Sequence, residues 1–149
     1  MLTPSNAIAN LVARYVRNTD RQDHAAQAEL FSDDAAVRVF VSTGDGEALL
    51  HGPIVGGAAV AKASAALRPP HPSGRRSRHC TTDHLVLIDG GNATLEAQFV
   101  VFRTERLPTG EVNSLPIETG EYRFRFRHGD HGWLISGFDI VIDAPVLPS

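Results

Sequence analysis

The chain of 149 residues carries 14 Lys or Arg and 17 Asp or Glu, which gives a formal net charge of −3 at pH 7. This length predicts a single domain over residues 1–149, and the net charge provides no overall field that would by itself recruit nucleic acid or anionic membranes. The one cysteine, Cys80, excludes an internal disulfide framework. No apolar segment approaches the roughly 20 residues of a membrane helix and no signal-peptide pattern opens the chain, so we expect a cytoplasmic protein that does not bind membranes.

Helical periodicity dominates the first part of the chain. Thr3 is the predicted N-cap of an amphipathic helix and Pro4 its first residue. The stripe of that helix consists of Ile8, Leu11, Val12, Tyr15, Val16 and Thr19. A shorter helix is expected in HAAQAELF (24–31), capped by Asp20 or Asp23. A third, Ala-rich helix is expected over Gly56–Leu67.

Strand patterns dominate the second part. A short strand is predicted earlier in AAVRVFV (35–41) and a smaller one in LLHG (49–52), whereas RPPHPSGRRSR (68–78) is too rich in Pro, Gly and Arg for regular structure. Four longer strands are expected at 84–89, 93–104, 119–128 and 133–142, paired antiparallel through their short connections. In EYRFRFRH, aromatic residues alternate with arginines, so one face of the sheet is covered. The chain is therefore predicted to be α+β, with three N-terminal helices on the concave side of a curved, mixed or antiparallel sheet.

Two separated residues offer catalytic chemistry. Asp20 lies at the end of the first helix, and His79 stands at the entrance of what we expect to be a central strand. Each has an ordinary explanation, because Asp20 is a suitable cap and a histidine at a strand end readily finds a backbone partner. As a pair they would form a general base, since a carboxylate that accepts the Nδ1 proton leaves Nε2 free to take a proton. Spacing along the chain does not show that they meet.

Other residues are candidates for contacting a ligand between helix and sheet. Tyr15 lies on the helical stripe, while Phe99 and Tyr122 lie on the apolar faces of their strands. The alternative for both tyrosines is a core position with the hydroxyl at the rim. Asp139 interrupts the apolar last strand, and it either reaches the pocket or points to solvent beside Gly137.

Metal-ligand residue types gather at His79, Cys80, Asp83 and His84. Strand alternation sends neighbouring side chains to opposite faces and no HxxxH or CxxC spacing is present, so no metal is expected. Cys80 is instead expected to be a small buried hydrophobe.

Several stretches together resemble a known family. The helical stripe, TDRQDHAAQAELFSDDA, RHCTTDHLVLIDGGNATLEAQFVVF and GEYRFRFRHGDHGWLISGFD are similar to the SnoaL-like branch of the nuclear transport factor 2-like superfamily. Within it, scytalone dehydratase and hexachlorocyclohexane dehydrochlorinase are most similar around Asp20 and His79. The resemblance implies that these two residues form an Asp-His dyad in a cone-shaped cavity.

The pattern departs from scytalone dehydratase at other pocket positions. Ala97 stands where that enzyme has a second pocket histidine, and Tyr122 stands where it has an asparagine. Scytalone itself is therefore not the expected substrate, although the base chemistry is retained.

The resulting expectation is a cofactor-independent, dehydratase-like lyase or isomerase acting on a small apolar ring-bearing substrate. The alternative is a non-catalytic ligand-binding or subunit protein, such as the small subunit of an aromatic-ring dioxygenase. Apolar residues on both faces of VVFRTE and LISGFDIVI predict a homo-oligomer, a dimer or a trimer. The tail DAPVLPS is expected to close the pocket or reach a neighbouring copy.

Overall fold

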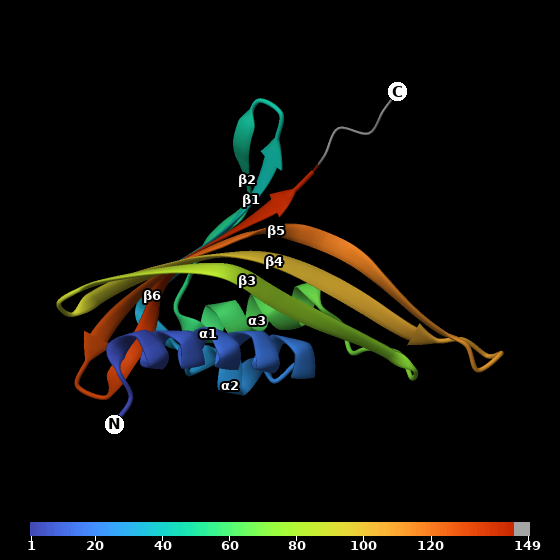
Figure 1. Cartoon of the computed structure of the whole chain (residues 1–149), viewed down its shortest axis with the longest axis horizontal. Helices are drawn as coiled ribbons and strands as arrows, with labels where there is room; N and C mark the ends of the chain where they lie inside the picture. Colours follow the sequence, from blue (N-terminus) through green and yellow to red (C-terminus); the bar gives the residue numbers. More distant parts are fainter. Residues whose placement is uncertain (145–149) are drawn as a thin grey trace.

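The computed structural model describes residues 1–144, so residues 145–149 of the tail lie outside it. Three helices and six strands follow one another along the chain (Figure 1). In chain order they are α1 (Pro4–Arg21), α2 (His24–Ala28), β1 (Phe31–Thr43), β2 (Gly46–Val55), α3 (Gly57–Leu67), β3 (Arg75–Asp89), β4 (Asn92–Arg106), β5 (Val112–Gly129) and β6 (Gly132–Asp143).

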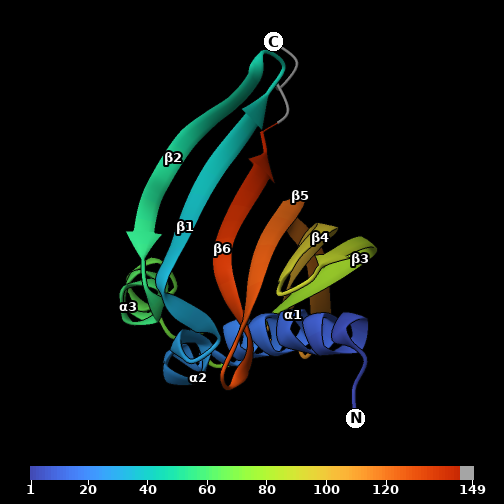
Figure 2. The same ribbon diagram turned by 90° about the vertical axis from the view of Figure 1, so that its left-hand side faces the viewer.

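The strands form one mixed sheet in the order β2-β1-β6-β5-β4-β3. The predicted antiparallel meander is present from β3 to β6, and β1 joins it by pairing parallel with β6. All three helices lie on the same side of the sheet, and α1 runs across its open, concave side (Figures 1 and 2). The predicted α+β class, with helices on the concave face of a curved mixed sheet, is confirmed.

Local chemistry sets the ends of α1 and α2. The hydroxyl of Thr3 accepts a hydrogen bond from the backbone N–H of Asn6 at 3.2 Å, so Thr3 is the predicted N-cap of α1. Asp23 caps α2 by accepting from the N–H of Ala26 at 3.0 Å. Because Asp23 takes this role, the carboxylate of Asp20 is available for other partners.

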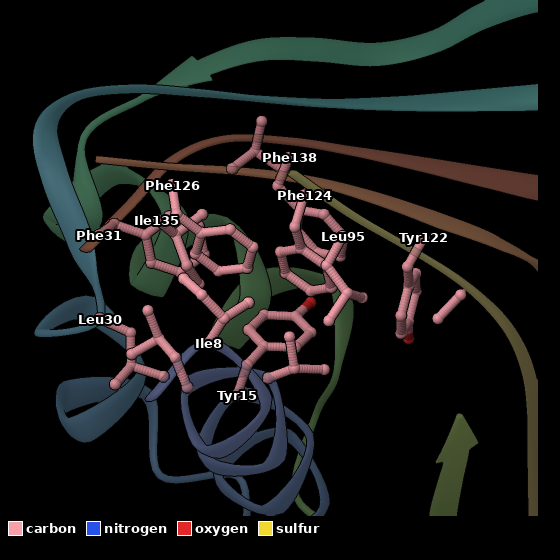
Figure 3. Close-up of a cluster of buried hydrophobic side chains, with 14 of the residues drawn as sticks. Ile8, Tyr15, Leu30, Phe31, Leu95, Tyr122, Phe124, Phe126, Ile135 and Phe138 are labelled. Atoms are coloured by element: carbon pink, nitrogen blue, oxygen red, sulfur yellow. The ribbon is translucent and has the colours of Figure 1, made fainter. Parts of the chain in front are cut away.

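The core lies between α1 and the sheet. Tyr15 reaches from α1 into a layer of aromatic side chains carried by the strands (Figure 3). Its ring meets Phe138 edge-on, with centroids 4.9 Å apart, and Phe138 stacks on Phe124 at 3.9 Å. Edge-to-face and offset contacts of this kind add to the burial of apolar area. This packing fixes α1 against the sheet.

The strand that carries His79 differs from the prediction in two ways. β3 begins at Arg75, nine residues before the expected start at His84, because β4 is long enough to pair with it as far as Arg75↔Glu105. It is also an edge strand, whereas a central one was predicted. An irregularity between Thr82 and Leu85, with Asp83 at φ 54°, interrupts the pairing where the sequence indicated a loop.

The prediction that Cys80 is buried is wrong. Its side chain is exposed, because it alternates with His79 and lies on the face of β3 that no helix covers.

Candidate active site

Asp20 and His79 are in direct contact. The Oδ1 atom of Asp20 lies 2.6 Å from Nδ1 of the His79 ring. The backbone N–H of His79 also donates to the carboxylate, at 3.0 Å to Oδ1 and 3.3 Å to Oδ2. The side chains are only 6% exposed for His79 and 11% exposed for Asp20. With Nδ1–H donated to the carboxylate, the free lone pair of the ring is on Nε2.

The position of β3 at the sheet edge explains the double contact. Each edge strand has backbone N–H groups without a partner strand, and buried groups of this kind need an acceptor. Asp20, in the last turn of α1, provides that acceptor for the N–H of His79 and orients the ring with the same oxygen. Asp20 and His79 therefore meet where the C-terminal end of α1 lies beside the edge strand β3.

A pocket of about 370 Å³ opens beside His79. It lies between the end of α1, the segment 68–72 that follows α3, and strands β3, β4 and β5. The sheet residues that face it are Arg75, Ser77, His79, Val101, Arg103, Ile117 and Glu118. The pocket therefore combines apolar walls with polar and charged groups around the imidazole, as small-ligand sites commonly do.

The two tyrosines lie deeper than the pocket wall. Tyr15 is 5% exposed and Tyr122 is 2% exposed, and neither lines the pocket. Burial raises the pKa of both hydroxyls, and the positive charge of Arg68 opposes this effect at both. The two hydroxyls therefore stay protonated at neutral pH.

Phe99 belongs to the same buried layer. Its ring stacks on Tyr122 with centroids 4.2 Å apart, and it is only 4% exposed. Phe99 supports Tyr122 from the side and does not line the pocket beside His79.

Asp139 is not brought to the pocket. In the sheet it pairs with Arg123, on the face opposite the helices. Its carboxylate accepts hydrogen bonds from Arg38 at 2.9 and 2.8 Å and from Arg125 at 3.3 Å. Burial raises the pKa of Asp139, but the hydrogen bonds from Arg38 and Arg125 outweigh it and hold the pKa below its usual value. The prediction that Asp139 contacts substrate is not supported by this position, because strand alternation sends it to the other face.

Sequence reasoning missed the pocket wall formed by residues 68–72. The signal was present in the RPPHP motif, whose three prolines cannot donate backbone hydrogen bonds. Such a segment has to be held by side chains from elsewhere. Gln22 does this: its Nε2 donates to the carbonyls of Arg68 at 3.4 Å and Pro69 at 2.9 Å, and its Oε1 accepts from the N–H of His71 at 3.3 Å.

Residues 1–144 contain no group of three or more His, Cys, Asp or Glu side chains arranged to hold a metal ion. Within the same residues, no helix is long and apolar enough to cross a membrane.

Comparison with known proteins identifies the family of the chain. The model of the SnoaL-like domain matches residues 1–139, so the chain belongs to the SnoaL-like family of the nuclear transport factor 2-like superfamily. No curated protein sequence matches the chain.

Solved structures agree with this assignment. A protein of unknown function from Mycobacterium tuberculosis is 28% identical, with a TM-score of 0.66 over 92% of this chain and 74% of that one. A nuclear transport factor 2-like protein with a cystatin-like fold from Novosphingobium aromaticivorans is 26% identical, with a TM-score of 0.63 over 93% of this chain and 80% of that one. A third structure, assigned as the beta subunit of an aromatic-ring-hydroxylating dioxygenase from the same organism, has a TM-score of 0.71 at 21% identity, over 96% and 91% of the two chains. At that identity the likeness concerns the fold alone.

Proposed function

We propose that the protein is a cofactor-independent lyase or isomerase that acts on a small ring-bearing molecule through an Asp-His general base. The observation that carries the proposal is the 2.6 Å contact between Asp20 and His79 at the wall of a pocket. A buried carboxylate-imidazole pair without a pocket beside it would be an ordinary structural contact. The neighbouring pocket gives it a place for a substrate.

In this proposal Nε2 of His79 removes a proton from a carbon that a neighbouring carbonyl or leaving group has made acidic. Asp20 keeps the ring in the required tautomer and stabilises the imidazolium once the proton has been taken up. Loss of a leaving group from the adjacent carbon gives elimination, and return of the proton at another carbon gives isomerisation. Both reactions share the first step, and it requires no metal or organic cofactor.

Tyr15 and Tyr122 have a supporting role in the proposal. Their hydroxyls stay protonated in the buried layer, and in this proposal one of them donates a hydrogen bond to an oxygen of the substrate. Phe99 keeps Tyr122 in place by stacking. Donors of this kind stabilise the negative charge that develops on a carbonyl oxygen during proton removal.

The resemblance to scytalone dehydratase and hexachlorocyclohexane dehydrochlorinase supports the same chemistry. It rests on the stretches around Asp20 and His79, and the structure adds the contact between them. Neither enzyme's substrate is carried over to this chain.

A second candidate function is a non-catalytic subunit or ligand-binding protein. It is favoured by the fold likeness to the dioxygenase beta subunit and by the packed aromatic layer of Tyr15, Phe99 and Tyr122, which fills the space below the central strands. The two candidates differ in what the pocket beside His79 does. Only an enzyme requires Nε2 of His79 for turnover.

The test is turnover of a panel of ketone, hydroxy-ketone and halogenated ring compounds by the wild type, His79→Ala and Asp20→Asn. The enzyme hypothesis predicts a loss of kcat/KM of about 10² to 10⁴ in both variants. His84→Ala, which removes an exposed histidine of the same strand, should retain full activity. If the wild type turns over a substrate and both dyad variants do so equally well, the general-base assignment is refuted. If no compound in the panel reacts, the result favours the second candidate, a non-catalytic subunit or ligand-binding protein.

A further inference from the structure

The arginines around the pocket are not equivalent. Arg75 forms an ion pair with Glu105, and Nε of Arg103 lies 3.6 Å from the same carboxylate. Arg68 also lines the pocket, yet among residues 1–144 its guanidinium has no ion pair or hydrogen bond. Glu118 is the carboxylate that shares the pocket wall with it, and the two groups form no ion pair. Arg68 is therefore the cation of the pocket that is not already paired.

The charge of Arg68 acts on the interior of the site. It opposes the effect of burial on the pKa of both Tyr15 and Tyr122, whereas the negative charge of Glu118 adds to that effect at both.

Arg68 is also held in place by a dedicated contact. It follows α3, and its backbone N–H bonds to the carbonyl of Ser64 at 2.9 Å. Its own carbonyl and that of Pro69 accept from the side-chain amide of Gln22. Gln22 stands in the left-handed conformation at the C-cap of α1, two residues after Asp20. One short segment therefore fixes both the dyad carboxylate and the base of the Arg68 side chain.

One part of the pocket wall suits an apolar ring. Val101 and Ile117 from the sheet and the prolines of the 68–72 segment offer carbon surface without donors. A guanidinium presents parallel N–H groups that match the two oxygens of a carboxylate, and it binds this group better than a single neutral oxygen. In this pocket a molecule with a ring and one carboxylate would place its ring against the apolar surface and its carboxylate against Arg68, away from Glu118.

We propose that the substrate is a ring compound bearing a carboxylate, and that Arg68 binds this carboxylate as the specificity-determining residue of the pocket. The carboxylate is a recognition group, separate from the carbon that loses its proton to His79. The inference rests on the proposed function, because it takes the same pocket as the substrate site. It adds the chemical class of the substrate, which the dyad alone does not define.

Matched acid and amide probes test the inference without knowledge of the substrate. A set of one-ring and two-ring aromatic carboxylates, among them benzoate and 2-naphthoate, is titrated by NMR against the corresponding neutral amides. The wild type should bind its best carboxylate about tenfold or more tightly than the matched amide, the difference expected for one charge-assisted pair. Arg68→Gln should remove this preference and Arg68→Lys should retain part of it. Arg14→Gln, which removes an exposed arginine of α1, should leave it unchanged.

The inference is overturned if Arg68→Gln keeps the preference for acids, if the wild type binds acids and amides equally, or if no acid of the set binds at millimolar concentration. Failure of the proposed function has a different signature. A general-base role that fails leaves turnover unaffected by His79→Ala, while the dependence of acid binding on Arg68 persists. Turnover by His79→Ala therefore tests the general-base role, and acid binding by Arg68→Gln tests the carboxylate site.

Discussion

The carboxylate of Asp20 accepts hydrogen bonds from both the backbone and the ring of His79. An aspartate between two helices is expected to cap the second one, but Asp23 takes that position. Which of the two acids is left to contact His79 depends on where α1 ends, and Gln22 ends it in the left-handed conformation. The role of Asp20 follows from these few residues around it.

The two tyrosines of the chain, Tyr15 and Tyr122, allow a direct test of their burial. Burial raises the pKa of both, so the native protein should form no phenolate near pH 10, where both would ionise in the unfolded chain. A pKa raised by folding gives stability that is fully present below the unfolded value and is lost as the pH rises through the folded one. Near-ultraviolet absorbance and circular dichroism should therefore show tyrosine ionisation together with alkaline unfolding. Ionisation of either tyrosine near pH 10 in a folded protein would contradict this.

We expect Asp139 to stabilise the folded protein and to have no part in turnover. Its pKa is held below the usual value by Arg38 and Arg125, so its contribution is present above about pH 4, the unfolded value, and is lost as the pH falls through the lower folded value. Asp139→Asn should cost about 1 to 2 kcal/mol at pH 7, since both arginines are partly exposed. Urea unfolding at several pH values should show the difference from wild type shrinking in acid. Asp45→Asn, in an exposed turn, is the control and should cost little.

At the scale of elements, Gln22 connects the end of α1 to the segment after α3. Pro69, Pro70 and Pro72 have no N–H group, so this segment cannot satisfy itself through backbone hydrogen bonds alone. The three hydrogen bonds of Gln22 to residues 68–71 replace them. The pocket wall is therefore held from the same helix end that carries the dyad acid.

The variant Gln22→Gly tests the hydrogen bonds between the Gln22 side chain and residues 68–71. Glycine suits the left-handed cap, where Gln22 has φ 57°, so the helix end should be kept while the side-chain amide is lost. In the wild type the backbone N–H of His71 donates to the side chain of Gln22, so its hydrogen exchange should become severalfold faster in the variant. The preference for carboxylate probes should also weaken. Unchanged exchange at His71 would show that the segment is held by other contacts. Arg21→Gly, one residue earlier, tests the effect of a glycine without loss of the amide.

At the scale of the whole molecule, the face of the sheet opposite the helices is not fully polar. Leu85 and Leu87 alternate along β3 with their side chains about 70% exposed. Elsewhere on this face arginines pair with acids, as Arg123 does with Glu47 and Glu121. Exposed leucines of this kind fit the expectation from the sequence that copies of the chain associate.

The predicted association can be measured by light scattering at micromolar concentration. The wild type should have the mass of a dimer or a trimer, and the double variant Leu85→Glu/Leu87→Glu should shift toward the monomer because it places charges on the exposed leucine positions. Leu2→Glu changes an exposed leucine at the N-terminus and should leave the mass unaltered. A monomeric wild type would refute the prediction.

Much of the fold could be predicted because its signals are local. The stripe from Ile8 to Val16 and the alternation of Tyr122, Phe124 and Phe126 with arginines depend on neighbours a few residues away. The extent of β3 could not be predicted in this way. Its first half is rich in Arg and polar residues, and it is a strand because β4 provides hydrogen-bond partners as far as Arg75.

The sequence by itself determined the helices, the meander, the family resemblance and the residue types Asp20 and His79. Only the tertiary structure decided that these two meet across 59 residues, that His79 lies on an edge strand with its N–H turned to Asp20, and that Asp139 faces away from the pocket. It also made Arg68 a pocket residue by means of Gln22. The physical reason is that periodicity records which face of an element is buried, whereas long-range contacts depend on strand register and on where elements end, and these are set by the packing of the whole chain.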